Sequence, residues 1–67
     1  MNFFAENLKT LRKEAGLLQR ELAEKLDLTK NAVSGWEVGR NQPDDDTLLR
    51  ICDIFDVSAD EILRTKL

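Results

Sequence analysis

The sequence predicts an all-α fold, in which five short helices form one compact domain over residues 1–67. Apolar residues of the first segment recur at the helical spacings of four, three and four: Phe4, Leu8, Leu11 and Ala15. Gly16 and Gly39 interrupt the helical pattern, and no segment is expected to form a strand. Isolated helices this short are marginal in water, so they must pack around one shared core.

The first two expected helices cover residues 4–15 and 19–26. Gly16 suits the left-handed position that follows many helices, so it should end the first. The second directs its apolar residues inward: Leu22, Ala23 and Leu26. The next break in the helical pattern is Asp27.

The third expected helix covers residues 30–38, with Thr29 as its N-cap and Gly39 at its end. Val33 and Trp36 fall on the face that points to the core. An exposed tryptophan could stack on a base, but the helical phase favours a core position for Trp36.

Two further helices are expected after Pro43. Asp44 or Asp45 can cap the fourth, which carries the apolar residues Leu48, Leu49, Ile51, Cys52 and Phe55. The run Ser58-Ala59-Asp60-Glu61 has the form of a capping box and opens the fifth, with Ile62 and Leu63 apolar. Because Cys52 lies on the apolar face, we expect a buried, inert thiol rather than a redox sensor.

The composition excludes several classes of function. The chain has no His and one Cys, so the common zinc sites and the Cys–His and Ser–His nucleophile pairs lack their residues. No apolar run approaches the 18 or so residues of a membrane span, and the first residues do not form a signal peptide. We therefore expect a small cytoplasmic binding module, not an enzyme, without cofactor, metal, membrane or evident small-molecule ligand.

Charge is distributed unevenly along the chain, whose net charge is −3. Residues 9–40 hold seven basic and five acidic side chains, whereas residues 41–67 hold three basic and seven acidic ones. The acidic excess therefore lies toward the C-terminus, and a basic face elsewhere remains open as an alternative to an ordinary mixed surface.

Residues 19–37 have the pattern of a helix, a tight turn and a second helix. Ala23 is small where the two helices would cross, and five apolar residues should close the wedge between helices: Leu22, Leu26, Leu28, Val33 and Trp36. The outer face of the second helix carries only small or polar residues. Such a helix can enter a major groove about 12 Å wide.

At this point the sequence resembles the lambdoid-phage repressor and Cro type of helix-turn-helix domain, the Xre family. The resemblance covers residues 6–64, and its marks occur in order: Leu11-Arg12, Gly16-Leu17, Gln19, Glu21-Leu22-Ala23, Leu26, Val33-Ser34, Trp36-Glu37, Gly39, Pro43, Thr47-Leu48 and Phe55-Asp56-Val57-Ser58. It implies a five-helix, lambda-repressor-like fold with the helix-turn-helix at about residues 19–38. It also implies a bacterial or phage-encoded transcriptional regulator, typically a repressor, that binds double-stranded operator DNA at the nucleoid as a homodimer.

The resemblance also implies a set of DNA contacts. The base contacts are expected at Lys30, Asn31, Ser34 and Gly35. Lys can donate to guanine and Asn can pair with adenine, whereas Gly35 offers either close backbone approach or only a weak helical position. The phosphate contacts are expected at Gln19, Arg40, Lys13 and Thr29. By the same resemblance, Arg12 and Glu37 form a partly buried structural ion pair.

Three positions depart from the family pattern. Leu18 stands where Ser or Thr usually caps the second helix, and we expect it to compensate by packing. Asp27 replaces the usual turn glycine, and we expect the turn to survive with some strain, because Asp tolerates the left-handed conformation better than most residues. Asp44-Asp45-Asp46 begins the fourth helix, where carboxylates would repel phosphate. This triplet favours the alternative of a protein-interaction module that has the same fold and binds DNA weakly.

Overall fold

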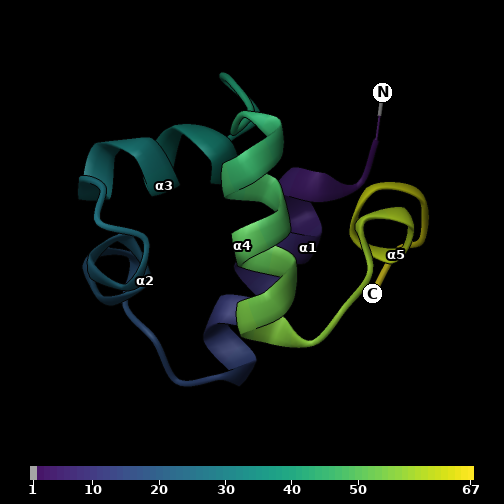
Figure 1. The fold of residues 1–67 in the computed structure, drawn as a ribbon, viewed down its shortest axis with the longest axis horizontal. Helices are drawn as coiled ribbons and strands as arrows, with labels where there is room; N and C mark the ends of the chain where they lie inside the picture. The colour runs from purple at the N-terminus through teal and green to yellow at the C-terminus, as the bar shows by residue number, and fades with distance from the viewer. Residues whose placement is uncertain (1) are drawn as a thin grey trace.

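The computed structural model describes residues 2–67, and five helices account for most of them (Figure 1). Their bounds are α1 Phe4–Glu14, α2 Gln19–Lys25, α3 Lys30–Glu37, α4 Asp45–Phe55 and α5 Ala59–Arg64. No strand occurs within residues 2–67. The all-α, five-helix prediction is confirmed, with helix ends within a residue or so of those expected.

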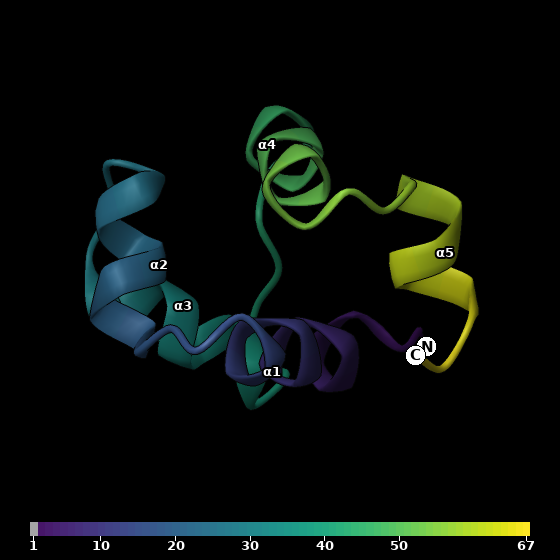
Figure 2. The ribbon, with the colours of Figure 1, turned by 90° about the horizontal axis from the view of Figure 1, so that it is seen from below.

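The helices surround the core from several sides. In Figure 1, α1 and α4 cross the middle of the molecule, α2 and α3 form one end, and α5 forms the other. Figure 2 shows α4 on one side, with α1 and α3 opposite. Helix α3 packs against both α2 and α1, while α5 packs against α1 and α4. No helix within residues 2–67 is long and apolar enough to cross a membrane.

The buried core draws residues from every helix: Phe4, Leu8, Leu22, Ala23, Leu26, Val33, Trp36, Ile51, Cys52 and Ile62. The predicted core positions of Trp36 and Cys52 are confirmed. Burial raises the pKa of the Cys52 thiol, which keeps it protonated and unreactive. Leu28 is 42% exposed, so the expectation that it closes the wedge between helices is wrong. Leu28 contributes to the turn through its backbone, whose N–H donates to the Ala23 carbonyl at 2.9 Å.

Most of the predicted helix ends are confirmed. Gly16 and Asp27 have φ angles of +74° and +59°, the left-handed conformation expected at both turns. The Asp44 side chain accepts a hydrogen bond of 2.9 Å from the Thr47 N–H and so caps α4. The Ser58–Glu61 capping box is present, with reciprocal hydrogen bonds of 3.0 and 2.9 Å.

Two cap predictions are wrong in detail. Thr29 is the N-cap residue of α3, but its hydroxyl accepts no capping hydrogen bond. Leu18 is 51% exposed and therefore does not compensate for its missing cap by packing. The compensation comes from Glu21, whose Oε1 accepts a hydrogen bond of 2.8 Å from the Leu18 N–H. This is the half of a capping box that needs no hydroxyl.

A buried amide that the sequence pattern does not indicate joins the two ends of the chain. Asn7 is 1% exposed, and its Nδ2 donates to the carbonyl oxygens of Ile62 and Thr65 at 2.8 and 2.7 Å. Its Oδ1 accepts a hydrogen bond of 2.8 Å from the Leu67 N–H. One side chain of α1 thus satisfies backbone groups at the end of α5, which helices otherwise leave unpaired.

Candidate nucleic-acid interface

Helices α2 and α3 form the helix-turn-helix at one end of the molecule (Figure 1). Between them, the Leu28 N–H donates to the Ala23 carbonyl at 2.9 Å, and Asp27 supplies the left-handed residue of the turn. Val33 and Trp36 fix the inner face of α3 in the core. The opposite face of α3 is therefore held in a defined orientation toward solvent.

Three of the expected base contacts lie on or beside this outer face. Lys30 and Asn31 are exposed in the first turn of α3, and Ser34 is half-buried one turn later. Val38, just past the end of α3, is an exposed apolar residue that the sequence analysis did not consider. The exposed residues at the N-terminal end of α3 are thus polar, and one exposed apolar residue follows its C-terminal end.

Gly35, the fourth residue expected at the bases, is buried. The Arg40 N–H donates to the Gly35 carbonyl at 2.9 Å, a bond that closes the C-terminal end of α3 around the left-handed Gly39. A Cβ atom at Gly35 would lie 3.0 Å from Oδ1 of Asn41. The Asn41 side chain therefore lies over Gly35. Gly35 is buried, whereas Lys30 and Asn31 are exposed.

Arg12 and Glu37 form an ion pair between α1 and the end of α3. Arg12 Nε donates to Glu37 Oε2 at 2.6 Å, and a terminal guanidinium nitrogen donates to Oε1 at 3.0 Å. The side chains are 9% and 2% exposed. The hydrogen bonds from the guanidinium to the Glu37 carboxylate raise the pKa of Arg12. A two-pronged, buried pair of this kind fixes both helices in position.

The same pair reaches two further groups beside α2. Arg12 donates a third hydrogen bond of 2.7 Å to the Leu17 carbonyl, in the segment that joins α1 to α2. Glu37 Oε1 also accepts a hydrogen bond of 3.0 Å from Gln19 Nε2, at the first residue of α2. The Gln19 amide is therefore held by Glu37. The sequence analysis did not anticipate this link.

A hollow of about 380 Å³ lies between the starts of α2 and α3. It is lined by Arg12, Leu18, Gln19, Arg20 and Lys30. Arg20 and Lys30 are exposed, so two cations reach solvent at its rim. The structure thus brings Gln19 and Lys30 together and adds Arg20, which the sequence analysis missed although it follows Gln19 directly.

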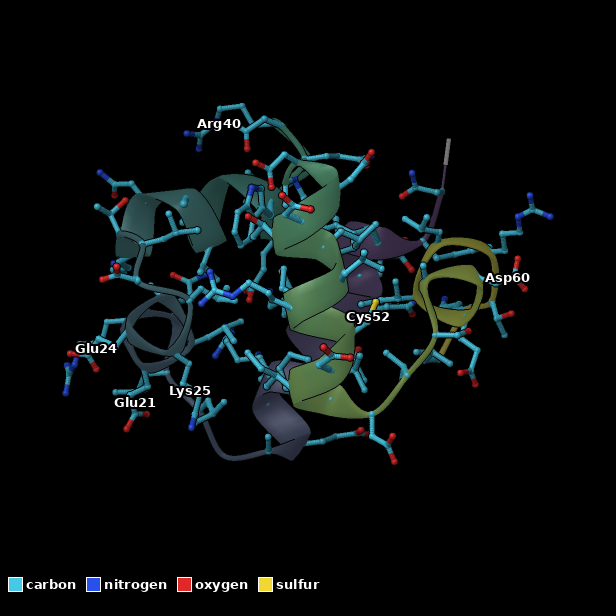
Figure 3. The ribbon with its side chains drawn as sticks, in the orientation of Figure 1. Glu21, Glu24, Lys25, Arg40, Cys52 and Asp60 are labelled. Carbon is cyan, nitrogen blue, oxygen red and sulfur yellow. The ribbon has the colours of Figure 1, made fainter. Side chains whose placement is uncertain are left out.

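The other expected phosphate contacts are more scattered. Thr29 and Arg40 are exposed on either side of α3. Figure 3 shows the Arg40 side chain on the side of α3 that faces away from α2, opposite Glu21, Glu24 and Lys25. Lys13 is exposed near the end of α1 and does not line the hollow.

Several acidic side chains lie at the start of α4 and on α5. Asp44, Asp45 and Asp46 are all exposed at the start of α4. The Thr47 hydrogen bonds stabilise the ionised Asp44 and lower its pKa. Asp60 lies on α5, at the end of the molecule opposite α2 (Figure 3). No group of three or more potential metal-binding side chains occurs in the part of the chain that the structure describes.

Comparison with known proteins identifies the family. A family model described as helix-turn-helix matches residues 8–62. YqaE of Bacillus subtilis, an uncharacterised HTH-type transcriptional regulator, is 44% identical over 61 residues, which are 91% of this chain and 53% of that protein. ImmR, an HTH-type transcriptional regulator of Bacillus subtilis, is 41% identical over 58 residues, which are 87% of this chain and 46% of that protein. The chain spans about half the length of these relatives.

Solved structures agree with the family assignment. A transcriptional regulator from Listeria innocua has a TM-score of 0.89 and 36% identity, covering 94% of this chain and 59% of that chain. SinR, a master regulator for biofilm formation solved in complex with DNA, has a TM-score of 0.73 and 32% identity, covering 82% and 89%. The P22 c2 repressor, solved with a synthetic operator, shares the fold over 100% of both chains at a TM-score of 0.87 and 21% identity. The family model and the sequence relatives confirm the resemblance, and this chain belongs to the helix-turn-helix family.

Proposed function

We propose that the protein is a sequence-specific DNA-binding transcriptional regulator that inserts α3 into the major groove of a two-fold operator as a homodimer. One observation carries the proposal most strongly. The inner face of α3 is locked in the core, while Lys30 and Asn31 are exposed in its first turn. Recognition helices of this class contact base edges with their N-terminal residues.

The exposed residues of α3 have the chemistry for base recognition. Lys30 can donate to the O6 and N7 acceptors of guanine, and the Asn31 amide can pair with N6 and N7 of adenine. Ser34 can donate to, or accept from, either kind of base edge. These groups stand on one helix, so they would meet neighbouring positions of one operator half-site.

Phosphate contacts are proposed beside these base contacts. Gln19 Nε2 carries two hydrogens, of which Glu37 takes one, so the second is available to a phosphate oxygen. Arg20 and Lys30 add positive charge at the rim of the same hollow. Arg40 and Thr29 lie on either side of α3, where each would contact the phosphate backbone of the DNA. Lys13 is a weaker proposal, because it lies outside this group.

The proposal of a homodimer rests on the small area of DNA that one domain of this size can contact. One module of this size buries about 600–1,000 Å² on DNA and reads only a short half-site. Two copies on half-sites about 34–36 Å apart would double the contacts. The SinR complex with DNA supports DNA as the partner of a close structural relative. A regulator of this kind would act in the cytoplasm, at the nucleoid.

Selection of bound duplexes from a random DNA pool tests the proposal. The wild type should enrich a two-fold sequence. Lys30→Ala and Asn31→Ala should each relax the preference at one base position of a half-site, at a cost of roughly 1–3 kcal/mol on the selected duplex. Lys25→Ala removes an exposed cation of α2 that Figure 3 shows away from α3, and it should leave the selected sequence unchanged. Equal loss on every sequence would mean that Lys30 and Asn31 do not read bases.

The acidic start of α4 supports a second candidate, a module that binds a protein partner and DNA only weakly. Asp45 and Asp46 are exposed and lack the hydrogen-bond role that Asp44 has in capping. The two candidates differ in their response to salt. Affinity for DNA falls steeply as salt rises because counterions are released, whereas an apolar protein interface is much less sensitive.

A further inference from the structure

Arg50 links α4 to the end of α2. Its Nη1 donates to the Leu26 carbonyl at 3.2 Å, and its Nη2 donates to the Lys25 carbonyl at 3.3 Å. The next residue, Ile51, is buried in the core, so the backbone that carries Arg50 is held in place. In both Figure 1 and Figure 2 the ribbons of α2 and α4 stand apart, and these two hydrogen bonds connect them.

The two carbonyls are the ones that the end of α2 leaves without a local donor. The preceding carbonyls, of Ala23 and Glu24, accept hydrogen bonds from the turn itself. Within residues 2–67, no backbone N–H donates to the carbonyl of Lys25 or of Leu26. A guanidinium suits this place, because cations stabilise the carbonyls at a helix C-terminus. Arg50 therefore completes the hydrogen bonding at the end of α2.

The guanidinium of Arg50 turns away from nearby acids to reach these carbonyls. Asp46 and Asp53 lie about one turn from it on α4, at the spacings where a carboxylate can pair with a guanidinium. The ion pairs in the part of the chain that the structure describes nevertheless do not include Arg50. Two bonds to one helix end therefore indicate a role at α2, not in a surface ion pair.

These bonds act where the chain turns toward the exposed end of α3. The Leu26 carbonyl belongs to the peptide group that leads into Asp27. The φ angle of Asp27 is +59°, a left-handed conformation that costs a residue with a side chain free energy. Helix α3 begins three residues later, at Lys30. Arg50 thus supports the peptide group at the entry to a strained turn.

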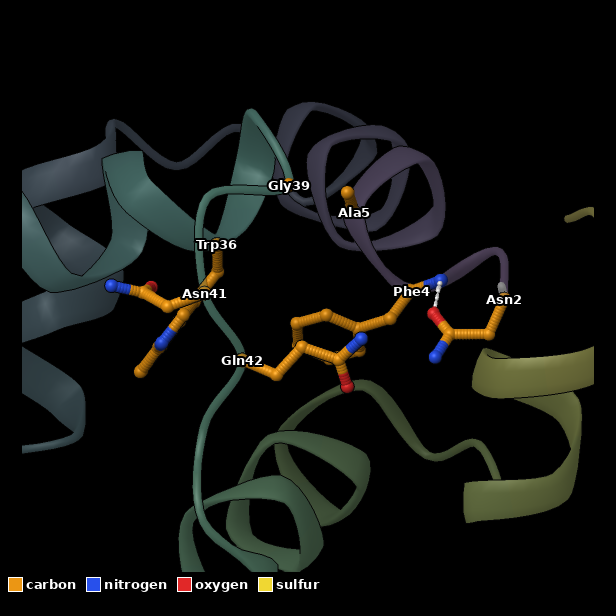
Figure 4. A pocket seen from close by; sticks show the side chains of 7 residues that line it. All are labelled: Asn2, Phe4, Ala5, Trp36, Gly39, Asn41 and Gln42. Carbon is orange, nitrogen blue, oxygen red and sulfur yellow. Dashed lines mark hydrogen bonds between the residues drawn. The ribbon is translucent and has the colours of Figure 1, made fainter.

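The other end of α3 has its own support from α1. The Arg12–Glu37 ion pair holds the last residue of α3. One residue earlier, the buried Trp36 borders a hollow of about 300 Å³ together with Phe4, the first residue of α1 (Figure 4). The bonds of Arg50 therefore support the opposite end of the helix, through the turn from which it starts.

We propose that Arg50 is a positioning residue for DNA recognition, which holds the end of α2 and the turn so that the first turn of α3 meets the bases in one orientation. The inference rests on the proposed DNA-binding function, and Arg50 needs no contact with DNA in this role. Base contacts depend on the orientation of the helix more than phosphate contacts do, because only base contacts carry sequence information directly. A turn that is already ordered also lowers the entropic cost of binding.

The test compares Arg50→Met with Arg64→Met, which removes the same charge from α5. Arg64 is exposed and pairs with Asp60, one turn earlier on its own helix. Methionine keeps an apolar stem and removes the donors. On the operator that the wild type selects, Arg50→Met should bind about tenfold more weakly than Arg64→Met. On a scrambled duplex the two variants should bind alike, because their net charge is the same.

Amide hydrogen exchange in the same variants reports on the turn itself. The Leu28 N–H closes the turn after α2 by its bond of 2.9 Å to the Ala23 carbonyl, and the Leu17 N–H makes the corresponding bond of 3.1 Å after α1. In Arg50→Met, exchange at Leu28 should be about tenfold faster than in Arg64→Met, with exchange at Leu17 unchanged. A general loss of stability would accelerate both amides.

A conservative variant separates the two-pronged contact from the charge. Arg50→Lys keeps the charge but replaces the forked guanidinium by one shorter ammonium, so it should regain little of the operator affinity that Arg50→Met loses. Full recovery in Arg50→Lys would mean that charge alone matters. Because Arg50 is exposed, both variants should remain folded at the temperature of the titration, which circular dichroism checks.

Three further results would overturn the inference. Arg50→Met and Arg64→Met could bind the operator equally, Arg50→Met could lose affinity to the same extent on both duplexes as a phosphate contact does, or exchange at Leu28 could stay at its wild-type rate. In each case the wild type still selects an operator, so the regulator function stands. A wild type that selects no sequence would instead refute the proposed function, and the role of Arg50 in recognition with it.

Discussion

Removal of the Arg12 guanidinium should destabilise the fold more than the loss of any exposed cation. In Arg12→Ala, the Glu37 carboxylate, 2% exposed, loses both of its guanidinium hydrogen bonds and keeps only the one from Gln19. The Leu17 carbonyl loses its donor as well. Breaking one side of a buried ion pair costs about 3–5 kcal/mol, because the remaining charge stays buried without a partner.

That cost is large beside the stability of the whole domain. At roughly 0.05–0.15 kcal/mol per residue, a chain of 67 residues has a free energy of unfolding of about 3–10 kcal/mol. For a domain of this size, each kcal/mol lowers the melting temperature by about 4–8 °C. Arg12→Ala should therefore melt at least about 12 °C below the wild type and be partly unfolded at 37 °C.

Circular dichroism during heating measures the effect, with Lys13→Ala as the control, because Lys13 is an exposed cation on the same helix. The double variant Arg12→Met/Glu37→Leu should regain much of the loss, since it leaves no buried charge. Recovery should be incomplete, because the Leu17 carbonyl and the Gln19 amide still lack their partners. If Arg12→Ala melts like the wild type and only DNA binding is lost, Arg12 is a DNA contact and the structural reasoning is wrong.

Three further predictions concern the acidic start of α4, the Asp44 cap and the buried amide of Asn7. Asp45→Asn/Asp46→Asn should bind DNA more tightly at low salt, and titrations should show the gain shrinking between 0.01 and 0.1 M salt, as the Debye length falls from about 30 to about 10 Å; a gain independent of salt would contradict the electrostatic cause. The pKa of Asp44 is lowered on folding, so its cap stabilises the protein above the pKa of the unfolded state and is lost as pH falls through the folded value, in the acid range below about pH 4. Asp44→Asn keeps a capping oxygen without this titration, so its urea midpoint should fall less than that of the wild type between pH 7 and pH 3; equal falls would exclude the Asp44 contribution. Asn7→Leu leaves three backbone groups unpaired and should cost on the order of 3 kcal/mol in urea unfolding, whereas an unchanged midpoint would mean that water replaces the amide.

Local signals in the sequence were enough to predict the helices. Gly16 and Asp27 occupy left-handed turns, and Ser58 and Glu61 form their capping box, because each depends only on residues a few positions away. The apolar periodicity likewise placed Trp36 and Cys52 in the core. The exposed Leu18 and Leu28 were mispredicted, because hydrophobicity alone does not say which apolar residues the turns leave outside.

The links between distant residues could not be predicted from such patterns. Asn7 bonds to groups 55 to 60 residues away, and an asparagine in a helix gives no sign of this. The covering of Gly35 by Asn41 depends on how the segment after α3 folds back. Gln19 was chosen for its place at the start of the second helix, but its bond to Glu37 depends on how α2 meets the end of α3. Each of these contacts follows from tertiary packing.

The affinity of the wild type for its selected duplex, measured by titration over a range of salt concentrations, tests the central claim most directly. If Arg20 and Arg40 neutralise phosphates of the DNA backbone, the logarithm of the binding constant should fall linearly with the logarithm of salt concentration, with a slope of about −0.9 for each phosphate neutralised. A scrambled duplex should bind more weakly by a factor of about 10³ or more. A flat salt response, equal affinity for both duplexes, or no binding at low salt would contradict the account.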